Sequence, residues 1–211
     1  MKLILALSAA LLLSATALAA EENPYGPDFF RAESWSGEYP AGFTVLEDTV
    51  LKLRPRLDPA AEASIDCPVT KGATFHTWNI PRSISDGLAF VSFTRVEEMT
   101  VKDAIDIVVY GEIDPTDVTL SLKPGDTWRY LVYYGEGSFL IEYDGKRYVA
   151  DQSLAEVSES SVPEGEREYH EWLRINCSNN LWGWFSMDEL AENAALGSPN
   201  ITQYGIAEDV K

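Results

Sequence analysis

LSLKPGDTWRYLVYYGEGSFLIEYDGKRYVADQSLAE, residues 120–156, carries the clearest fold signal in the chain. Turn residues divide it at Pro124-Gly125, Gly135-Glu136-Gly137 and Asp144-Gly145, and the runs between them are rich in aromatic and β-branched residues. Asp144-Gly145 is the strongest hairpin signal, because a type I′ turn needs two residues that tolerate positive φ. The stretch therefore predicts a small antiparallel β unit.

Two features of this stretch recur elsewhere in the chain. Gly72-Ala-Thr-Phe-His-Thr-Trp78 and Gly125-Asp-Thr-Trp-Arg-Tyr-Leu131 share one order of glycine, threonine, aromatic and apolar residues, which predicts a turn followed by a strand. The endings Tyr148–Glu156 and Trp184–Glu192 also match, and Phe90–Glu98 is a weaker third match. An internal repeat of about 55 residues accounts for these matches.

The repeated parts resemble bacterial Src-homology-3-like (SH3b) domains. In that family a first strand, a long loop, a glycine turn leading into an aromatic strand, a hairpin and a Gly-Trp/Tyr-Val ending follow one another. The resemblance implies an all-β fold with two small SH3-like β-barrel modules. In one copy it rests on Leu122, Gly125, Trp128, Leu131, Phe139, Ile141, Tyr143, Gly145, Tyr148, Val149 and Leu154, and in the other on Leu51, Leu53, Pro55, Val69, Gly72, Phe75, Trp78, Trp172, Leu173, Gly183, Trp184, Phe185 and Leu190.

Two arrangements of the modules are open. In the favoured one, the first module (44–98) is completed by residues 165–192 around an inserted second module (101–157), since residues 49–80 lack a hairpin and residues 168–192 lack a front half. The alternative is a plain tandem whose first copy ends at Phe90–Glu98. Residues 20–43 are expected to be an irregular lead segment with its aromatic rings on the folded body, and residues 193–211 a tail in which Ile201–Ile206 adds an edge strand.

The first residues carry the pattern of a secretory signal peptide. Lys2 is followed by an apolar run from Leu3 to Leu13 and by Ala17-Leu18-Ala19 as a small-x-small cleavage site. This pattern predicts a cleaved signal peptide over residues 1–19. We therefore expect a secreted or periplasmic protein.

The charge of the chain limits its partners. Cleavage after Ala19 of the 211-residue chain leaves 192 residues with 34 acidic and 15 basic side chains, a net charge of −19. Such a surface repels phosphate backbones and anionic lipid head groups, so nucleic acid and membrane are not expected partners. A basic protein is favoured as partner, and the alternative is that the charge only keeps an exported protein soluble.

The two cysteines favour a disulfide. An exported chain with an even number of cysteines predicts a Cys67–Cys177 bridge, with two free buried thiols as the alternative. A zinc site that adds His76 and His170 is disfavoured, because its spacings of nine and seven residues differ from those of structural zinc loops. Cysteine catalysis is also disfavoured, since Cys67 precedes Pro68 without a helix start and Cys177 has no histidine that follows it. The sequence thus predicts no enzyme, no metal and no cofactor.

Aromatic side chains are the remaining candidates for a site. SH3-like domains bind short peptides or wall stem peptides in an aromatic groove between the long loop and the hairpin turn. The resemblance implies ligand-binding roles for Tyr110, Tyr133, Tyr134 and Trp182. The alternative is that these rings are core or cross-strand pairs.

The sequence-based hypothesis is a secreted, non-catalytic binding protein. Its SH3-like modules would recognise a protein, a peptide or a cell-wall ligand. One alternative is an acidic inhibitor or accessory subunit of an exported enzyme, and a second is a cell-wall hydrolase whose acids are scattered along the sequence.

Overall fold

The computed structural model describes residues 23–33, 40–77, 90–114, 116–163 and 166–199, and the backbone of 201–202 and 205–206. The predicted signal peptide, Trp35 and Trp78 lie outside the described residues. The described chain is almost entirely β, as the sequence predicts. Its elements are β1 (Phe29–Ala32), β2 (Gly42–Val45), β3 (Thr49–Leu53), β4 (Ile65–Val69), β5 (Thr74–His76), β6 (Phe90–Arg95), β7 (Glu97–Val101), β8 (Ile105–Gly111), β9 (Asp117–Leu122), β10 (Thr127–Gly135), β11 (Ser138–Tyr143), β12 (Lys146–Asp151), α1 (Ser153–Glu156), β13 (Ser158–Ser160), β14 (Tyr169–Asn176), β15 (Trp182–Ser186), the 3₁₀ turn η1 (Met187–Glu189), β16 (Leu196–Gly197), β17 (Ile201–Thr202) and β18 (Gly205–Ile206).

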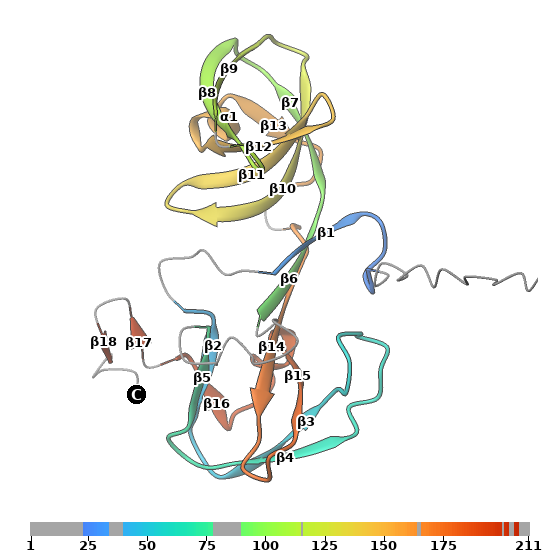
Figure 1. Cartoon of the computed structure of the whole chain (residues 1–211), viewed down its shortest axis with the longest axis vertical. Helices are drawn as coiled ribbons and strands as arrows, with labels where there is room; N and C mark the ends of the chain where they lie inside the picture. Colours follow the sequence, from blue (N-terminus) through green and yellow to red (C-terminus); the bar gives the residue numbers. More distant parts are fainter. Residues whose placement is uncertain are drawn as a thin grey trace, which may run out of the picture.

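One lobe is built from a single stretch of chain, residues 97–160, and is called the contiguous lobe. It lies at the top of Figure 1 and contains one seven-stranded sheet in the order β13-β7-β10-β11-β12-β8-β9. Asp144 (φ 50°) and Gly145 (φ 68°) form the two-residue turn between β11 and β12, which confirms the predicted hairpin. The core of this lobe comprises Met99, Val101, Ile107, Val109, Leu120, Leu122, Trp128, Phe139, Ile141, Tyr148, Ala150 and Leu154.

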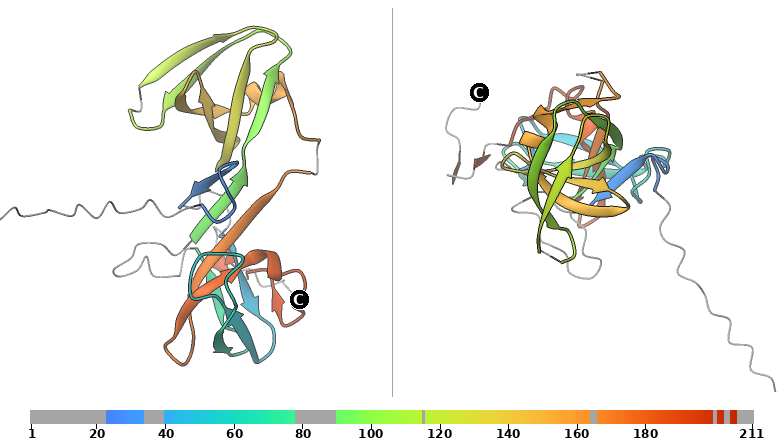
Figure 2. Two further views of the ribbon diagram at one scale, coloured as in Figure 1. Left: turned by 90° about the vertical axis from the view of Figure 1, so that its right-hand side faces the viewer. Right: turned by 90° about the horizontal axis from the view of Figure 1, so that it is seen from above.

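The other lobe draws on two stretches of chain, residues 40–95 and 169–197, and is called the two-segment lobe. It contains the sheets β16-β2-β5 and β3-β4, and a sheet β1-β6-β14-β15 to which the lead segment contributes β1. A bridge between Arg54 and Trp184 joins β3 to β15. Both stretches enter one core, and the contiguous lobe lies between them in sequence (Figures 1 and 2). This core comprises Ala41, Phe43, Val45, Leu51, Leu53, Cys67, Val69, Phe90, Leu173, Ile175, Cys177, Phe185 and Leu196.

The two glycine turns that match in sequence also match in hydrogen bonding. The Gly72 N–H donates to the Val45 carbonyl at 2.8 Å, and the Gly125 N–H donates to the Val101 carbonyl at 2.9 Å. The valine that accepts this bond also donates its own N–H to the carbonyl of the residue after the glycine, Val45 to Ala73 at 2.8 Å and Val101 to Asp126 at 2.9 Å. Both glycines have positive φ (84° and 94°), a conformation that glycine adopts without steric cost. The strands that flank the turns are also ordered alike, as β16-β2-β5 and β13-β7-β10.

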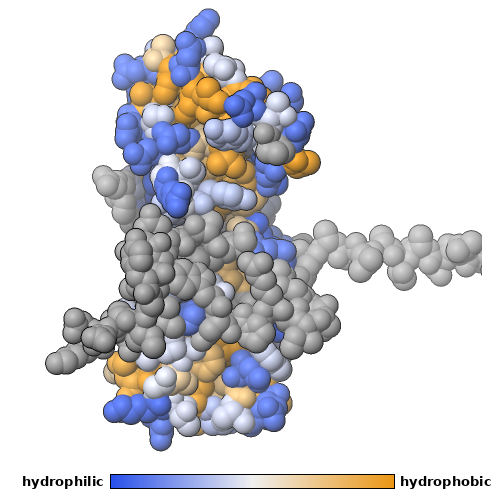
Figure 3. Space-filling model, turned by 60° about the vertical axis from the view of Figure 1, so that its left-hand side comes forward, coloured by the Kyte–Doolittle hydropathy of each residue, from blue (hydrophilic) through white to orange (hydrophobic). Residues whose placement is uncertain are grey.

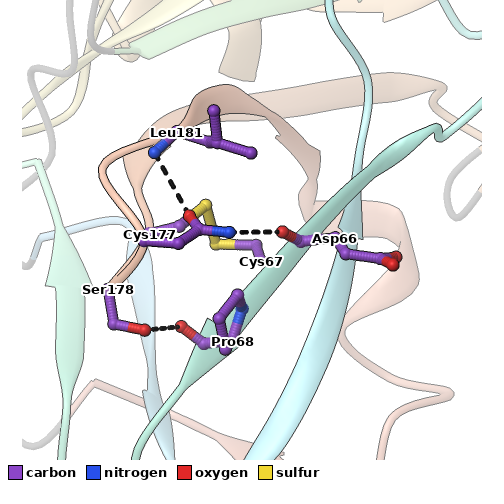
Figure 4. Close-up of a disulfide and its surroundings, with 7 residues drawn as sticks. Asp66, Cys67, Pro68, Cys177, Ser178 and Leu181 are labelled. Carbon is purple, nitrogen blue, oxygen red and sulfur yellow. Dashed lines mark hydrogen bonds between the residues drawn. A yellow bond between two sulfur atoms is a disulfide. The ribbon is translucent and has the colours of Figure 1, made fainter.

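The predicted disulfide joins the two stretches of the two-segment lobe. Cys67 of β4 and Cys177, directly after β14, are bonded with their Cα atoms 5.0 Å apart. The Ser178 hydroxyl donates to the Pro68 carbonyl at 2.8 Å beside it (Figure 4). Because the two sulfurs are bonded to each other, neither cysteine is a thiolate nucleophile or a zinc ligand.

The structure corrects the predictions for both ends of the chain. The lead segment was expected to be irregular, yet β1 and the first residues of β2 lie within it. Phe29 and Phe30 show no strand alternation, and β1 forms because the edge of β6 is available to pair with it. In the tail, β16 pairs with β2, whereas among the described strands β17 and β18 pair only with each other and add no edge strand to a larger sheet.

The lobes meet where β6 runs into β7. Only Val96 separates these strands. The Glu97 carboxylate, 2% exposed, lies 3.3 Å from Arg167 Nε and accepts a 2.7 Å hydrogen bond from the Ser160 hydroxyl. Across the same junction Arg147 lies over the Phe30 ring, 5.1 Å from its centre. Contacts from β1, from β7 and from the segment between β13 and β14 therefore hold the two lobes together.

Candidate functional site

The hairpin of β8 and β9 exposes apolar side chains on the contiguous lobe. Alternation directs Ile107 and Val109 into the core and leaves Val108 and Tyr110 outside, each 49% exposed. Ile113, in the loop between the strands, is 94% exposed. The side of the molecule that carries this hairpin comes forward in Figure 3, where hydrophobic side chains gather among hydrophilic ones. An apolar surface of this kind, rimmed by polar groups, is typical of an interaction site.

The same hairpin is acidic. It carries four acidic residues, Asp106, Glu112, Asp114 and Asp117, and Asp103 lies just before it. Residues 103–122 contain no lysine or arginine. Arg147 of β12 approaches from outside, with its Nη1 3.5 Å from a Glu112 oxygen. The other carboxylates make the electrostatic potential around the exposed apolar side chains negative, and this potential attracts cations.

Tyr133 and Tyr134 lie at the end of β10, in the same lobe. They are 51% and 45% exposed, whereas the other aromatic side chains of this lobe, Tyr110 apart, are buried or half-buried. The Tyr133 hydroxyl accepts a 3.1 Å hydrogen bond from the Gly137 N–H, which fixes its ring against the turn between β10 and β11. These rings offer open aromatic faces at the rim of the sheet.

The structure does not bring the four sequence-predicted ligand residues into one groove. By register, Tyr133 shares the sheet face of its partner Phe139, and Tyr110 shares the opposite face with its partner Val149. Trp182 lies in the two-segment lobe, where the Arg174 guanidinium is 5.9 Å from its ring centre. The expectation of one shared groove combined positions from two copies of the repeat, and those copies fold into separate lobes. Binding by each residue stays a prediction.

A second surface lies on the two-segment lobe, where the lead segment covers a sheet face. Tyr25 packs against Phe93 (ring centres 4.8 Å apart) and stacks on His170 (4.2 Å), and its hydroxyl accepts a 2.9 Å hydrogen bond from Trp172 Nε1. Beside it, a cleft of about 760 Å³ is lined by Asn23, Pro24, Gly26, Pro27, Arg56, Leu57 and Asp58. Neither Tyr25 nor this cleft has a signal in the sequence, because the turn that forms them shows no periodicity.

Carboxylates occupy both ring nitrogens of His170. Nδ1 lies 2.7 Å from Asp188 and Nε2 lies 3.2 Å from Glu168. This histidine therefore holds Tyr25 in place and has no free nitrogen to activate a nucleophile. Burial raises the pKa of Tyr25 to about 12, and burial together with the charge of Asp188 raises the pKa of Glu171 to about 7.

The described residues offer no group of three or more histidine, cysteine or acidic side chains arranged to hold a metal ion. Within those residues there is also no helix of the length and apolarity needed to cross a bilayer. No family model, curated protein or solved structure matches the chain.

Proposed function

We propose that the protein is an exported, non-catalytic binding protein composed of two SH3-like β modules, and that its ligand is a basic protein or peptide. The contiguous lobe is one module, and the two-segment lobe is the other, interrupted by the first. The bonded cysteines support an oxidising compartment outside the cytoplasm.

The order of elements supports the SH3-like assignment. In the contiguous lobe a first strand is followed by a long hairpin, a glycine turn, a three-stranded meander, one helical turn and a last strand that returns to the first. The two-segment lobe repeats the last steps, as β15 leads into η1 and then into β16. The hydrogen bonds of Gly72 and Gly125 relate the two lobes in detail.

The observation that carries the proposed ligand class is the acidic hairpin of β8 and β9 with its exposed Val108, Tyr110 and Ile113. Open tyrosine rings attract lysine and arginine through cation–π contact, and carboxylates around them strengthen that attraction. A partner that is apolar as well as basic would bury the exposed side chains. An exported enzyme with such a surface is one such partner, which keeps the role of inhibitor or accessory subunit as the alternative.

The test is binding of the mature chain to immobilised poly-L-lysine, poly-L-glutamate and peptidoglycan, at low and high salt. We expect retention on poly-L-lysine at low salt, loss at high salt because the attraction is screened, and no retention on poly-L-glutamate. Tyr110→Ala and Ile113→Ser should weaken retention, whereas Leu181→Ser, which alters a half-exposed leucine of the other lobe, should leave it unchanged. Failure to bind poly-L-lysine at low salt would refute the proposed function.

A further inference from the structure

Strand β9 forms an open edge of the seven-stranded sheet. It is last in the strand order, and no other described strand lies beside its outer side. Its six residues, DVTLSL, pair with β8 without a bulge and include no proline and no lysine. Proteins usually protect exposed edges with such residues or with bulges, because an unprotected edge pairs with other chains. The edge of β9 carries none of these protections.

The hydrogen-bond alternation identifies which backbone groups face outward. The Gly111 N–H donates to the Thr116 carbonyl at 3.4 Å, and on the other side the next residue, Glu112, donates its N–H to the Arg147 carbonyl of β12 at 3.2 Å. The backbone groups of Gly111 therefore face β9, and those of Glu112 and Tyr110 face β12. Pairs alternate along an antiparallel ladder, and the next pair is Tyr110 with Asp117. The N–H and C=O groups of Asp117, Thr119 and Ser121 therefore point away from β8, toward the open side. They can form hydrogen bonds with an added strand.

Other sheet edges in the described part of the chain are shorter or protected. β13 spans three residues and β1 four. The outer side of β15 already exchanges hydrogen bonds between Trp184 and Arg54, at 2.9 and 2.8 Å. In the β3-β4 pair, β3 carries Lys52 and β4 carries Pro68. Among the described strands that end a sheet, β9 is the longest.

We infer that the edge of β9 binds an extended segment of the partner, of alternating apolar and basic residues, by strand addition. This inference rests on the proposed function and specifies how its ligand is held. Backbone hydrogen bonds to residues 117, 119 and 121 supply the attachment, as in other proteins that bind a peptide at a sheet edge. The side chains of the added strand select its sequence.

The side-chain pattern of β9 dictates the alternation. Leu120 and Leu122 point inward, 8% and 2% exposed, so every second residue of the added strand lies beside the apolar margin of the core. The other residues of the added strand lie beside the exposed Asp117, Thr119 and Ser121. Asp106, which pairs with Ser121, adds a second carboxylate to that face. Cationic side chains are favoured there, since opposite charges on neighbouring strands attract.

The experiment measures binding of the heptapeptide KVKVKVK to the full mature chain by fluorescence anisotropy. The peptide carries a fluorescent label on its N-terminus and an amide at its C-terminus. Thr119→Pro removes an outward N–H and leaves the ladder with β8 intact, and Thr119→Val is the matched control with an unchanged backbone. The proline variant should weaken binding at least about tenfold, because it loses a backbone hydrogen bond and projects a ring into the edge. The valine variant should bind like the wild type.

Two further peptides keep the test valid if the proline variant fails to fold. A KVKVKVK peptide with N-methyl groups on its lysine amides, the amides that face β9 when the lysines lie beside Asp117, Thr119 and Ser121, should not bind the wild type. EVEVEVE should not bind either. In the complex, amide exchange at Thr119 and Ser121 should slow. Equal binding of KVKVKVK to the wild type and to a folded Thr119→Pro variant would overturn the edge site alone. If the wild type is retained on poly-L-lysine but does not bind KVKVKVK, only the edge site is overturned. If the wild type binds none of the basic probes, the proposed function itself is overturned.

Discussion

Tyr25 is the residue that secures the lead segment to the two-segment lobe. Its ring lies against Phe29, Phe93 and His170, and its hydroxyl accepts the indole N–H of Trp172, which is 1% exposed. A buried N–H that loses its acceptor has no water to replace it. The phenol oxygen therefore stabilises the fold beyond what ring packing alone contributes.

Tyr25→Phe removes that oxygen and keeps the ring. We expect the free energy of unfolding to fall by about 1–3 kcal/mol, the cost of an unsatisfied buried donor. Urea denaturation followed by tryptophan fluorescence measures the change. Tyr133→Phe is the matched control, since the Tyr133 hydroxyl likewise accepts one N–H, here the backbone N–H of Gly137, but lies on an exposed side chain. This variant should have little effect. Equal losses for the two variants would contradict this account.

Glu171 makes stability depend on pH. Its pKa of about 7 in the folded protein exceeds the ordinary value of 4.5, chiefly through burial and also through Asp188. The folded state therefore holds the proton more tightly than the unfolded state, and stability falls as the pH rises from about 4.5 to 7. We expect Glu171→Gln to be more stable than the wild type at about pH 8, by an amount on the order of 2 kcal/mol, with the advantage absent near pH 4. Urea midpoints of both proteins across this range provide the measurement, and parallel curves would refute the assignment.

The glycine turns are equivalent elements that can be tested as a pair. A Cβ added at Gly72 or at Gly125 has no heavy atom within 4 Å, so the cost of alanine comes from the positive φ and not from a clash. Gly72→Ala and Gly125→Ala should each destabilise by roughly 1–2 kcal/mol, the penalty of a left-handed conformation for an L-residue. Chemical denaturation of both variants measures these costs. If one turn tolerated alanine and the other did not, the equivalence of the two turns would be wrong.

Among the strands and turns, the sequence predicts those with strong local signals and misses those that depend on distant partners. The hairpin at Asp144-Gly145 is local in origin, since its turn residues alone select the conformation. Strand β1 and strand β16 depend on pairing with β6 and β2, which no neighbouring residue encodes. The candidate surface divides in the same way. Exposed Tyr110 follows from alternation along β8, whereas the open edge of β9 depends on where the sheet ends.

In the whole molecule, the disulfide acts on one lobe. It closes a separation of 110 residues, and both cysteines belong to the core of the two-segment lobe. Replacing both with alanine should reduce the stability of that lobe by an amount on the order of 4–5 kcal/mol in the loop-entropy model. Amide exchange should accelerate in β3, β4, β14 and β15 and remain slow in β10, β11 and β12. Uniform acceleration in both lobes would show that they unfold as one unit.

The insertion of one lobe into the other also sets the order in which the lobes can fold as the chain is synthesised. Residues 97–160 contain every strand of the contiguous lobe, so this lobe can close as soon as they have emerged. The two-segment lobe must wait for β14, β15 and β16, the last of which ends at Gly197, and Cys67 has no partner until Cys177 appears. During that interval β2 to β6 have an incomplete core. In a pulse-chase experiment we expect protease resistance of residues 97–160 to precede formation of the disulfide, and a chaperone to bind residues 40–95 in the interval between the two events.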